Sequence, residues 1–349
     1  MKLQLAAAFA ALVACAPSFA QQDAGKTETA ETIHWPVPWK VGQVFTYETE
    51  SLDAEQAPNK REKTRSTDTT KITITEATTD GYVQRWISTA PKVQMLEGDA
   101  NAAKLMESLA TSLTDLVILV ELDKEATYKR IRNIDEISTR MRAALKPLLD
   151  AEVEKGIAKA KGDDIDTKAA LEQARGQLDK MLDGLSSPAY LEAVLGQVVQ
   201  NYNAFVGIAL EDGASYSVES ELDNPLGGRK FPATVEFGLY VSEDDPEDVF
   251  LEWTSTIDPE RGAEAIWELA EKLVGMQIPK EQRKELPTQV SIVDEGFVIF
   301  NRSSGVIEMY ENERKVDLGD THKSDRDRMR LVDGEHEHEW KEGGAAAGD

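Results

Sequence analysis

The spacing of the apolar residues changes twice along the chain. Over residues 44–47, 69–75 and 82–87 they follow a strand pattern, with a charged loop expected over 54–64, and Asp80-Gly81 is a strong hairpin signal. Over about 134–206 the spacing becomes helical, and from about 205 to 332 alternation returns between turn residues. This order predicts an α+β fold. A curved antiparallel β-sheet, with meander hairpins at both ends of the chain, is covered by a central multi-helix insertion.

The helical insertion is predicted to divide at Pro147, near Gly162 and at Ser186. Its last helix starts after Ser187 and carries an apolar stripe. Candidate residues for lining an apolar ligand site on this stripe are Leu191, Leu195, Val198, Tyr202 and Phe205. A helix that is simply buried in the core would carry the same stripe, so both interpretations stay open.

Several shorter signals define the domain and its surroundings. Residues 34–333 are predicted to form a single domain between a disordered leader at 21–33 and a disordered acidic, Gly- and Ala-rich tail at 334–349. Trp35-Pro36-Val37-Pro38-Trp39 predicts an extended segment that anchors two indoles on the edge of the domain. Asp258 followed by Pro259 predicts a further helix start.

The first twenty residues have the features of an export signal. Lys2 precedes an apolar stretch, and Ser18-Phe19-Ala20 places small residues at a cleavage site. Alternatively, Leu12-Val13-Ala14-Cys15 matches the pattern at which bacterial lipoproteins are cleaved and lipidated on the cysteine. Both interpretations predict export, either to the periplasm or the exterior, or as an outer-membrane-anchored lipoprotein. Membrane contact is expected only if Cys15 is lipidated.

Charge and cysteine content exclude several classes of partner. The 39 basic and 64 acidic residues give a net charge of −25, which repels phosphate backbones, so we expect no nucleic-acid partner. After residue 20 no apolar run approaches the roughly 18 residues that span a membrane, so we expect no transmembrane span in the mature chain. Cys15 is the only cysteine, so the domain must be held by its core without disulfides.

No motif identifies a catalytic residue or a cofactor. The histidines are His34, His322, His336 and His338, and no Gly-x-Ser-x-Gly nucleophile motif accompanies them. His336 and His338, with the neighbouring glutamates, form the best metal-like group, although we expect only adventitious binding because no rigid element surrounds them. The many acidic residues leave open a hydrolase whose site is built from scattered carboxylates.

Two segments carry a resemblance to known proteins. Val41-Gly42-Gln43-Val44-Phe45-Thr46-Tyr47 resembles the opening of many exported bacterial proteins, and Ser303-Ser304-Gly305-Val306-Ile307 is a hairpin of the same kind. The pattern is similar to the lipoprotein-carrier superfamily, in which a curved antiparallel sheet covered by helices holds acyl chains. The resemblance implies a non-enzymatic envelope protein that binds an apolar small molecule or a partner segment between sheet and helices. The long helical insertion departs from the carrier pattern, and an extracytoplasmic hydrolase is the alternative.

Overall fold

The computed structural model describes residues 31–98 except 38, 107–108, 111, 114–160, 175–176, 178–180, 182–222, 229–258, 260–274 and 290–332. The first strands are β1 (Thr32–His34), β2 (Val44–Ala57), β3 (Lys60–Thr78), β4 (Gly81–Ser88), β5 (Lys92–Glu97), β6 (Val117–Leu122) and β7 (Tyr128–Ile131). The later strands are β8 (Ala209–Glu211), β9 (Ser215–Leu222), β10 (Phe231–Val241), β11 (Asp248–Ile257), β12 (Val290–Asn301), β13 (Ile307–Leu318) and β14 (Thr321–Leu331). The helices used below are α2 (Ile134–Ala160), α4 (Pro188–Asn203) and α5 (Ala263–Val274).

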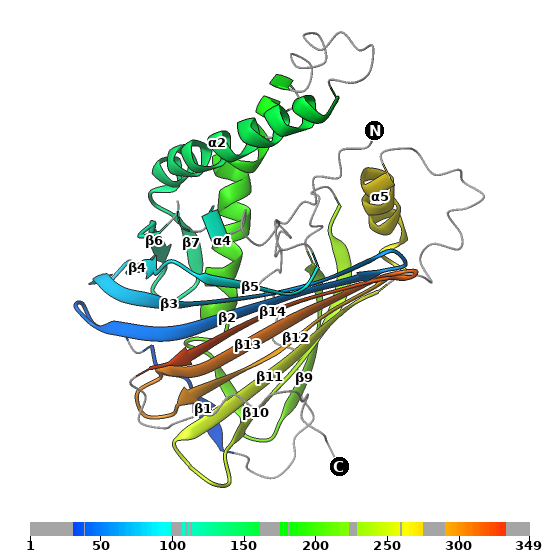
Figure 1. Ribbon diagram of the computed structural model, residues 1–349. Coiled ribbons are helices and arrows are strands. Elements are labelled where there is room, and N and C mark those ends of the chain that lie inside the picture. Colours follow the sequence, from blue (N-terminus) through cyan, green and yellow to red (C-terminus); the bar gives the residue numbers. More distant parts are fainter. Residues whose placement is uncertain are drawn as a thin grey trace.

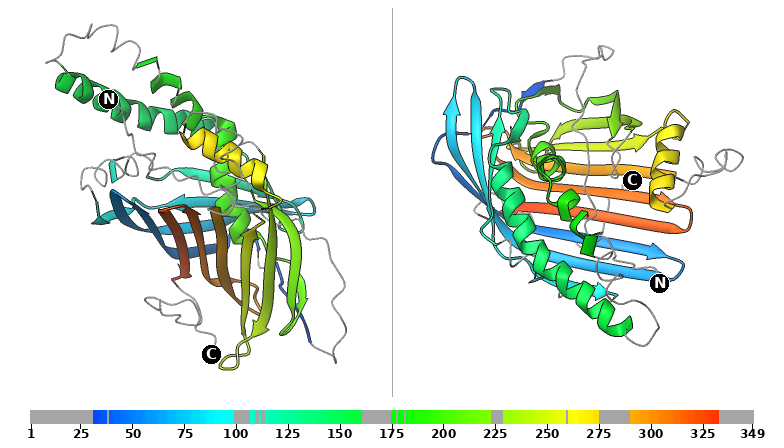
Figure 2. Two further views of the ribbon diagram at one scale, coloured as in Figure 1. Left: turned by 90° about the vertical axis from the view of Figure 1, so that its right-hand side faces the viewer. Right: turned by 90° about the horizontal axis from the view of Figure 1, so that it is seen from above.

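One antiparallel sheet of 12 strands dominates the structure (Figure 1). Its strand order is β7-β6-β4-β3-β2-β14-β13-β12-β11-β10-β9, and β5 pairs with another part of β3. Because β14 pairs with β2, the two β-rich parts of the sequence join in one sheet, which confirms the predicted antiparallel arrangement. Within the described residues the sheet is open, with β7 and β9 at its edges, and it curves around the C-terminal end of α4 (Figure 2).

The predicted helical cover is present only in part. α4 begins at Pro188, where the Ser187 hydroxyl accepts a hydrogen bond from the Tyr190 N–H, as the sequence predicts. α2 contacts α4 and β6 and extends away from the sheet instead of lying on it (Figure 1). The predicted division at Pro147 is wrong, because α2 continues through this residue. Proline has no N–H to donate to the carbonyl oxygen of Ala143, but Ala143 is exposed, so water can donate to that oxygen instead. No helix of the described residues is both long and apolar enough to cross a membrane.

The register divides the side chains between two faces of the sheet. Successive residues of a strand point to opposite faces, and residues directly opposite each other on neighbouring strands share a face. The face that carries Tyr47 is here the inner face, and the face that carries Glu50 is the outer face. Leu331 lies opposite Tyr47 and Arg328 opposite Glu50, so the pairing of β2 with β14 orders both faces.

The inner face is apolar where the end of α4 reaches it. The Tyr47 hydroxyl lies 2.8 Å from the Tyr202 hydroxyl and donates to the carbonyl oxygen of Ile307 over 2.9 Å. Just beyond the helix, the ring centroid of Phe205 lies 5.4 Å from that of Trp253. Burial of these aromatic rings attaches the helix end to the sheet.

The segment around Trp35 packs into the same apolar cluster. Trp35 stacks on Phe300 at 3.8 Å between ring centroids, and its indole N–H donates to the carbonyl oxygen of Gly305 over 2.9 Å. Gly305 has a φ of +72°, and a Cβ there would lie 2.1 Å from the carbonyl oxygen of Pro36. Trp35 and Trp39 are both buried, so the two indoles do anchor this segment, but they do so in the core and not on the edge.

α5 covers the far end of the inner face. Asp258, the predicted cap, accepts hydrogen bonds from the backbone N–H groups of Glu260 and Arg261 at 3.0 Å, and the helix begins later than predicted. Its buried residues are part of a second apolar cluster that contains Phe231, Ile257, Ala265, Ile266, Val290 and Ile292. The inner face therefore has an apolar cluster at each end.

Between these clusters, the inner face carries a row of charged residues. In register, Asp53 lies opposite Asp325, Asp325 opposite Arg314, and Arg314 opposite Asp294. Arg314 forms a buried bidentate ion pair with Asp294, with its Nε and Nη2 atoms 2.6 and 2.5 Å from the two carboxylate oxygens. Lys323 approaches Asp325 Oδ2 to 3.1 Å. Asp53 and Asp325 thus face each other as two carboxyl groups, an arrangement that disfavours charge on both.

Two carboxyl groups of this row, those of Asp53 and Asp327, take up a proton more readily than a free aspartate does. Burial, and then the nearby Asp325 carboxylate, raises the pKa of Asp53 to about 7. Oδ1 of Asp325 is buried and has no other donor among the described residues, so a proton on Asp53 can be shared with it. Burial also raises the pKa of Asp327 to about 6, although Ser51 donates a hydrogen bond to this carboxylate. The row is therefore less negative than its composition suggests.

The packing of Phe205 predicts a large stability difference between two positions of the same stripe. Phe205→Ala should lower the free energy of unfolding by about 3–5 kcal/mol, because it leaves a cavity between α4 and the sheet. Val198→Ala, at a side chain that is 41% exposed, should change it by less than about 0.5 kcal/mol. Urea denaturation measures both, and equal losses would contradict the packing described above.

The paired carboxyls predict how stability changes with pH. Because the folded pKa of Asp53 is raised, its contribution to stability is greatest when it is protonated and declines as the pH rises from about 4 to 7. Asp53→Asn should therefore raise the free energy of unfolding at pH 8 by on the order of 1 kcal/mol and flatten this pH dependence. Asp244→Asn, in an exposed turn, is the control that should change neither. Identical pH profiles for Asp53→Asn and the parent would refute the shared proton.

Candidate functional site

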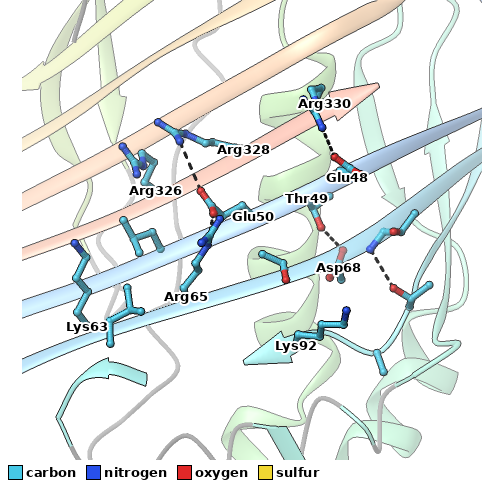
Figure 3. Close-up of a pocket in the computed structure, with 16 residues that line it drawn as sticks. Glu48, Thr49, Glu50, Lys63, Arg65, Asp68, Lys92, Arg326, Arg328 and Arg330 are labelled. Carbon is cyan, nitrogen blue, oxygen red and sulfur yellow. Dashed lines mark hydrogen bonds and ion pairs between the residues drawn. The ribbon is translucent and has the colours of Figure 1, made fainter. Parts of the chain in front are cut away.

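A groove of about 670 Å³ crosses the outer face of β3, β2 and β14 (Figure 3). Its lining includes six basic residues, which are Lys63, Arg65, Lys92, Arg326, Arg328 and Arg330. Only three acidic residues join them, namely Glu48, Glu50 and Asp68. The lining of this groove therefore has an excess of positive charge, although the chain as a whole has a net charge of −25.

Strand alternation explains why the cations gather here. In Arg326-Asp327-Arg328-Met329-Arg330 on β14, the three arginines point to the outer face while Asp327 and Met329 point to the inner face. Lys63 and Arg65 follow the same two-residue spacing on β3. Because β2 lies between β3 and β14, the groove has cationic strands on both sides of a strand that supplies two glutamates.

Ion pairs across the strands hold part of this lining in place. Glu50 is 8% exposed, and Arg328 from β14 and Arg65 from β3 both reach it, as Figure 3 shows. The Nε atom of Arg328 also lies 2.7 Å from Glu311 Oε2 on β13. Arg330 pairs with Glu48 at 2.5 Å. These arginines form a cross-strand ladder with fixed positions, and the glutamates balance part of their charge.

Three other cations of the groove have no counter-charge among the residues that the structure describes. Lys63, Lys92 and Arg326 make no ion pair with any residue that the structure describes. The Nε atom of Arg326 is buried and has no hydrogen-bond partner within this part of the chain. A buried guanidinium donor without an acceptor is costly, and an anion in the groove would supply one.

The predicted lining of an apolar site is divided between two clusters. Leu191 and Leu195 pack with α2, whereas Tyr202 and Phe205 belong to the main core under the sheet, and Val198 is 41% exposed. A small gap beside Tyr202, bordered by Trp39, Phe45, Tyr47 and Val206, has no room for a water molecule. An apolar ligand could enter here only if the end of α4 left the sheet. The role of these five residues in ligand binding therefore stays a prediction.

The remaining predicted sites lie apart from the groove. Cys15, His336 and His338 fall outside the described residues. His34 is exposed on β1, and the exposed His322 places Nδ1 2.6 Å from Asp317 Oδ1. Among the described residues, no group of three or more His, Cys, Asp or Glu side chains is arranged to hold a metal ion. The carboxyls of Asp53, Asp325 and Asp327 converge on the inner face but do not line the groove.

Sequence reasoning did not identify the groove. A usable signal was present, since Arg326-x-Arg328-x-Arg330 and Lys63-x-Arg65 place cations on one face of two strands in an acidic chain. This signal does not reveal that β2 pairs with β14. That pairing leaves only β2 between the arginines of β14 and the cations of β3.

Comparison with known proteins gives only a distant likeness. No family model matches the chain, and no curated protein matches its sequence. Among solved structures, it is similar to lipovitellin, from a structure described as "Lipid-protein interactions in lipovitellin", with a TM-score of 0.40 and 8% sequence identity. The match covers 84% of this chain and 25% of that chain, so this chain spans about a quarter of lipovitellin's length. A likeness of this size carries no argument about a ligand.

Proposed function

We propose that this protein is an exported, non-enzymatic binding protein whose outer-face groove holds an anionic ligand. The observation that carries the proposal is a set of three cations, Lys63, Lys92 and Arg326, that share one groove of a strongly acidic chain and have no ion pair within its described part. Export rests on the signal-like residues 1–20, with lipidation at Cys15 as the alternative.

Electrostatics favours an anion in this groove. Cations that share a groove repel one another, and a bound carboxylate or phosphate group would neutralise that repulsion. A guanidinium such as that of Arg326 can hold such a group through two parallel hydrogen bonds. The negative field of the rest of the molecule would direct an anion away from other surfaces and confine specific binding to this groove.

The arrangement of the cations favours a chain-like ligand. Same-face residues of a strand lie about 6.6–6.8 Å apart, and neighbouring strands about 4.8 Å apart. An extended chain with acid groups on alternate residues repeats at the same distance as Arg326, Arg328 and Arg330. We therefore place an acidic extended polymer, such as an acidic peptide segment, ahead of a single small anion. The net charge of −25 opposes a nucleic acid.

The two earlier hypotheses have less support from the geometry. Apolar-ligand binding between α4 and the sheet requires a space that Tyr202 and its neighbours fill. A hydrolase would find its carboxyls in the Asp53–Asp325 pair, but the groove does not reach that pair. Anion binding uses a groove that the described residues already form.

The binding proposal is tested with fluorescent poly-L-glutamate at low salt, followed by anisotropy. Lys63→Gln/Lys92→Gln/Arg326→Gln should weaken binding by about 0.5–1 kcal/mol for each cation removed, or roughly 10- to 100-fold in Kd. Added salt should weaken binding by the parent protein, and inorganic phosphate should bind far more weakly than the polymer.

The matched control is Lys40→Gln/Lys129→Gln/Lys146→Gln, which removes the same charge from exposed positions outside the groove. It should leave the Kd within about twofold, because screening limits the effect of distant charges. Equal weakening in both triple variants would overturn the proposed function.

A further inference from the structure

One charged segment of the sequence has no role in the function proposed above. Residues 333–349 contain six acidic residues and one lysine. Within them, Glu335, Glu337 and Glu339 recur at two-residue intervals, so an extended backbone would place their carboxylates on one side, about 6.6–6.8 Å apart. Arg326, Arg328 and Arg330 have the same interval on the groove side of β14.

The segment also starts beside the groove. Arg330, which lines the groove, is followed by Leu331, the last residue of β14. The N–H of Val332 donates to the carbonyl oxygen of Thr46 over 2.8 Å, which fixes the point where the chain leaves the sheet. Glu48 and Arg330 line one end of the groove and lie opposite each other in register, so the chain leaves the sheet at that end.

Chain length permits the segment to return along the groove. Glu339 lies seven positions after Val332, a reach of about 23–25 Å when extended. Arg330 and Arg326 are four residues apart on β14, or about 13 Å. Asp333-Gly334 is a dipeptide that favours a reversal of chain direction, and it stands directly before the three glutamates.

We infer that residues 333–349 of the same chain occupy the basic groove, with Glu335, Glu337 and Glu339 against its cations, and compete there with an external anionic ligand. The inference rests on the proposed function and names its partner as an acidic extended peptide. It also gives Lys63, Lys92 and Arg326 counter-charges within the protein itself. The external ligand then binds only by displacing this segment, so its apparent affinity is lower than the intrinsic one.

The first test uses the full chain with Glu335→Gln/Glu337→Gln/Glu339→Gln and the same poly-L-glutamate assay. The affinity should rise roughly three- to tenfold, because the internal competitor has lost its charges. The control variant Glu243→Gln/Asp244→Asn/Glu260→Gln makes the same change in net charge at exposed positions and should leave the affinity unchanged. An equal rise in both variants would show a general charge effect and overturn the inference.

Failure of the inference and failure of the proposed function give different results. If the parent binds the polymer, loses binding with the groove substitutions, and is unaffected by the three glutamate substitutions, the segment is not the occupant and the proposed function stands. If the parent does not bind and the glutamate variant does not bind either, the groove is not an anion site and both proposals fail.

The second test identifies the occupant directly. A carbodiimide joins lysine amines to carboxylates that touch them, and peptide mapping should find Glu335, Glu337 or Glu339 joined to Lys63 or Lys92. Mixing ¹⁴N- and ¹⁵N-labelled protein distinguishes the same chain from a second copy. Links within one isotope support the inference; mixed-isotope links would assign the segment to a neighbouring molecule, and links only to lysines outside the groove would overturn it.

Discussion

The pairing of β2 with β14 is the constraint on which the other features depend. It joins residues as distant as Glu48 and Arg330, which are 282 positions apart, and it closes the gap between the two β-rich parts of the chain. A shift of one residue would exchange the faces of every side chain on β14. The three arginines would then enter the inner face, and Asp325 and Asp327 would line the groove. One register therefore sets both the apolar core and the position of the basic groove.

This register separates charge across the thickness of the sheet. On the outer face of β3, β2 and β14 cations outnumber carboxylates, whereas on the inner face of β2 and β14 Asp53, Asp325 and Asp327 gather. Burial, and then the Asp325 carboxylate, raise the pKa of Asp53 to about 7, so a proton on Asp53 reduces the repulsion on the inner face. The outer cations have no such option, because lysine and arginine stay charged at neutral pH. A bound anion would relieve the repulsion that the groove's glutamates leave unbalanced, which is why the groove and not the inner row supports a binding function.

The sequence predicted local structure better than it predicted sites. Alternation and turn residues indicated most of the strands, and Ser187-Pro188 indicated the start of α4, because both signals depend on neighbouring residues alone. The charged loop predicted over 54–64 is wrong, because β2 and β3 stay paired as far as Ala57 and Lys60. The interpretation of Pro147 as a helix break was wrong because solvent exposure, which sequence does not reveal, makes its lost hydrogen bond tolerable. The apolar stripe of α4 was real, yet the sequence could not indicate that two clusters would share it. The groove and the Asp53–Asp325 pair both require a long-range strand pairing that no local pattern specifies.

Lysine footprinting of the full chain tests anion binding at the outer face most directly. Acetylation rates of individual lysines are measured by mass spectrometry in the presence and absence of poly-L-glutamate, in the Glu335→Gln/Glu337→Gln/Glu339→Gln variant so that the groove is open to the polymer. Lys63 and Lys92 should become protected, while the exposed Lys40, Lys129 and Lys146 should react at unchanged rates. Unchanged acetylation of Lys63 and Lys92 at saturating polymer, or protection confined to lysines outside the groove, would contradict anion binding in the groove.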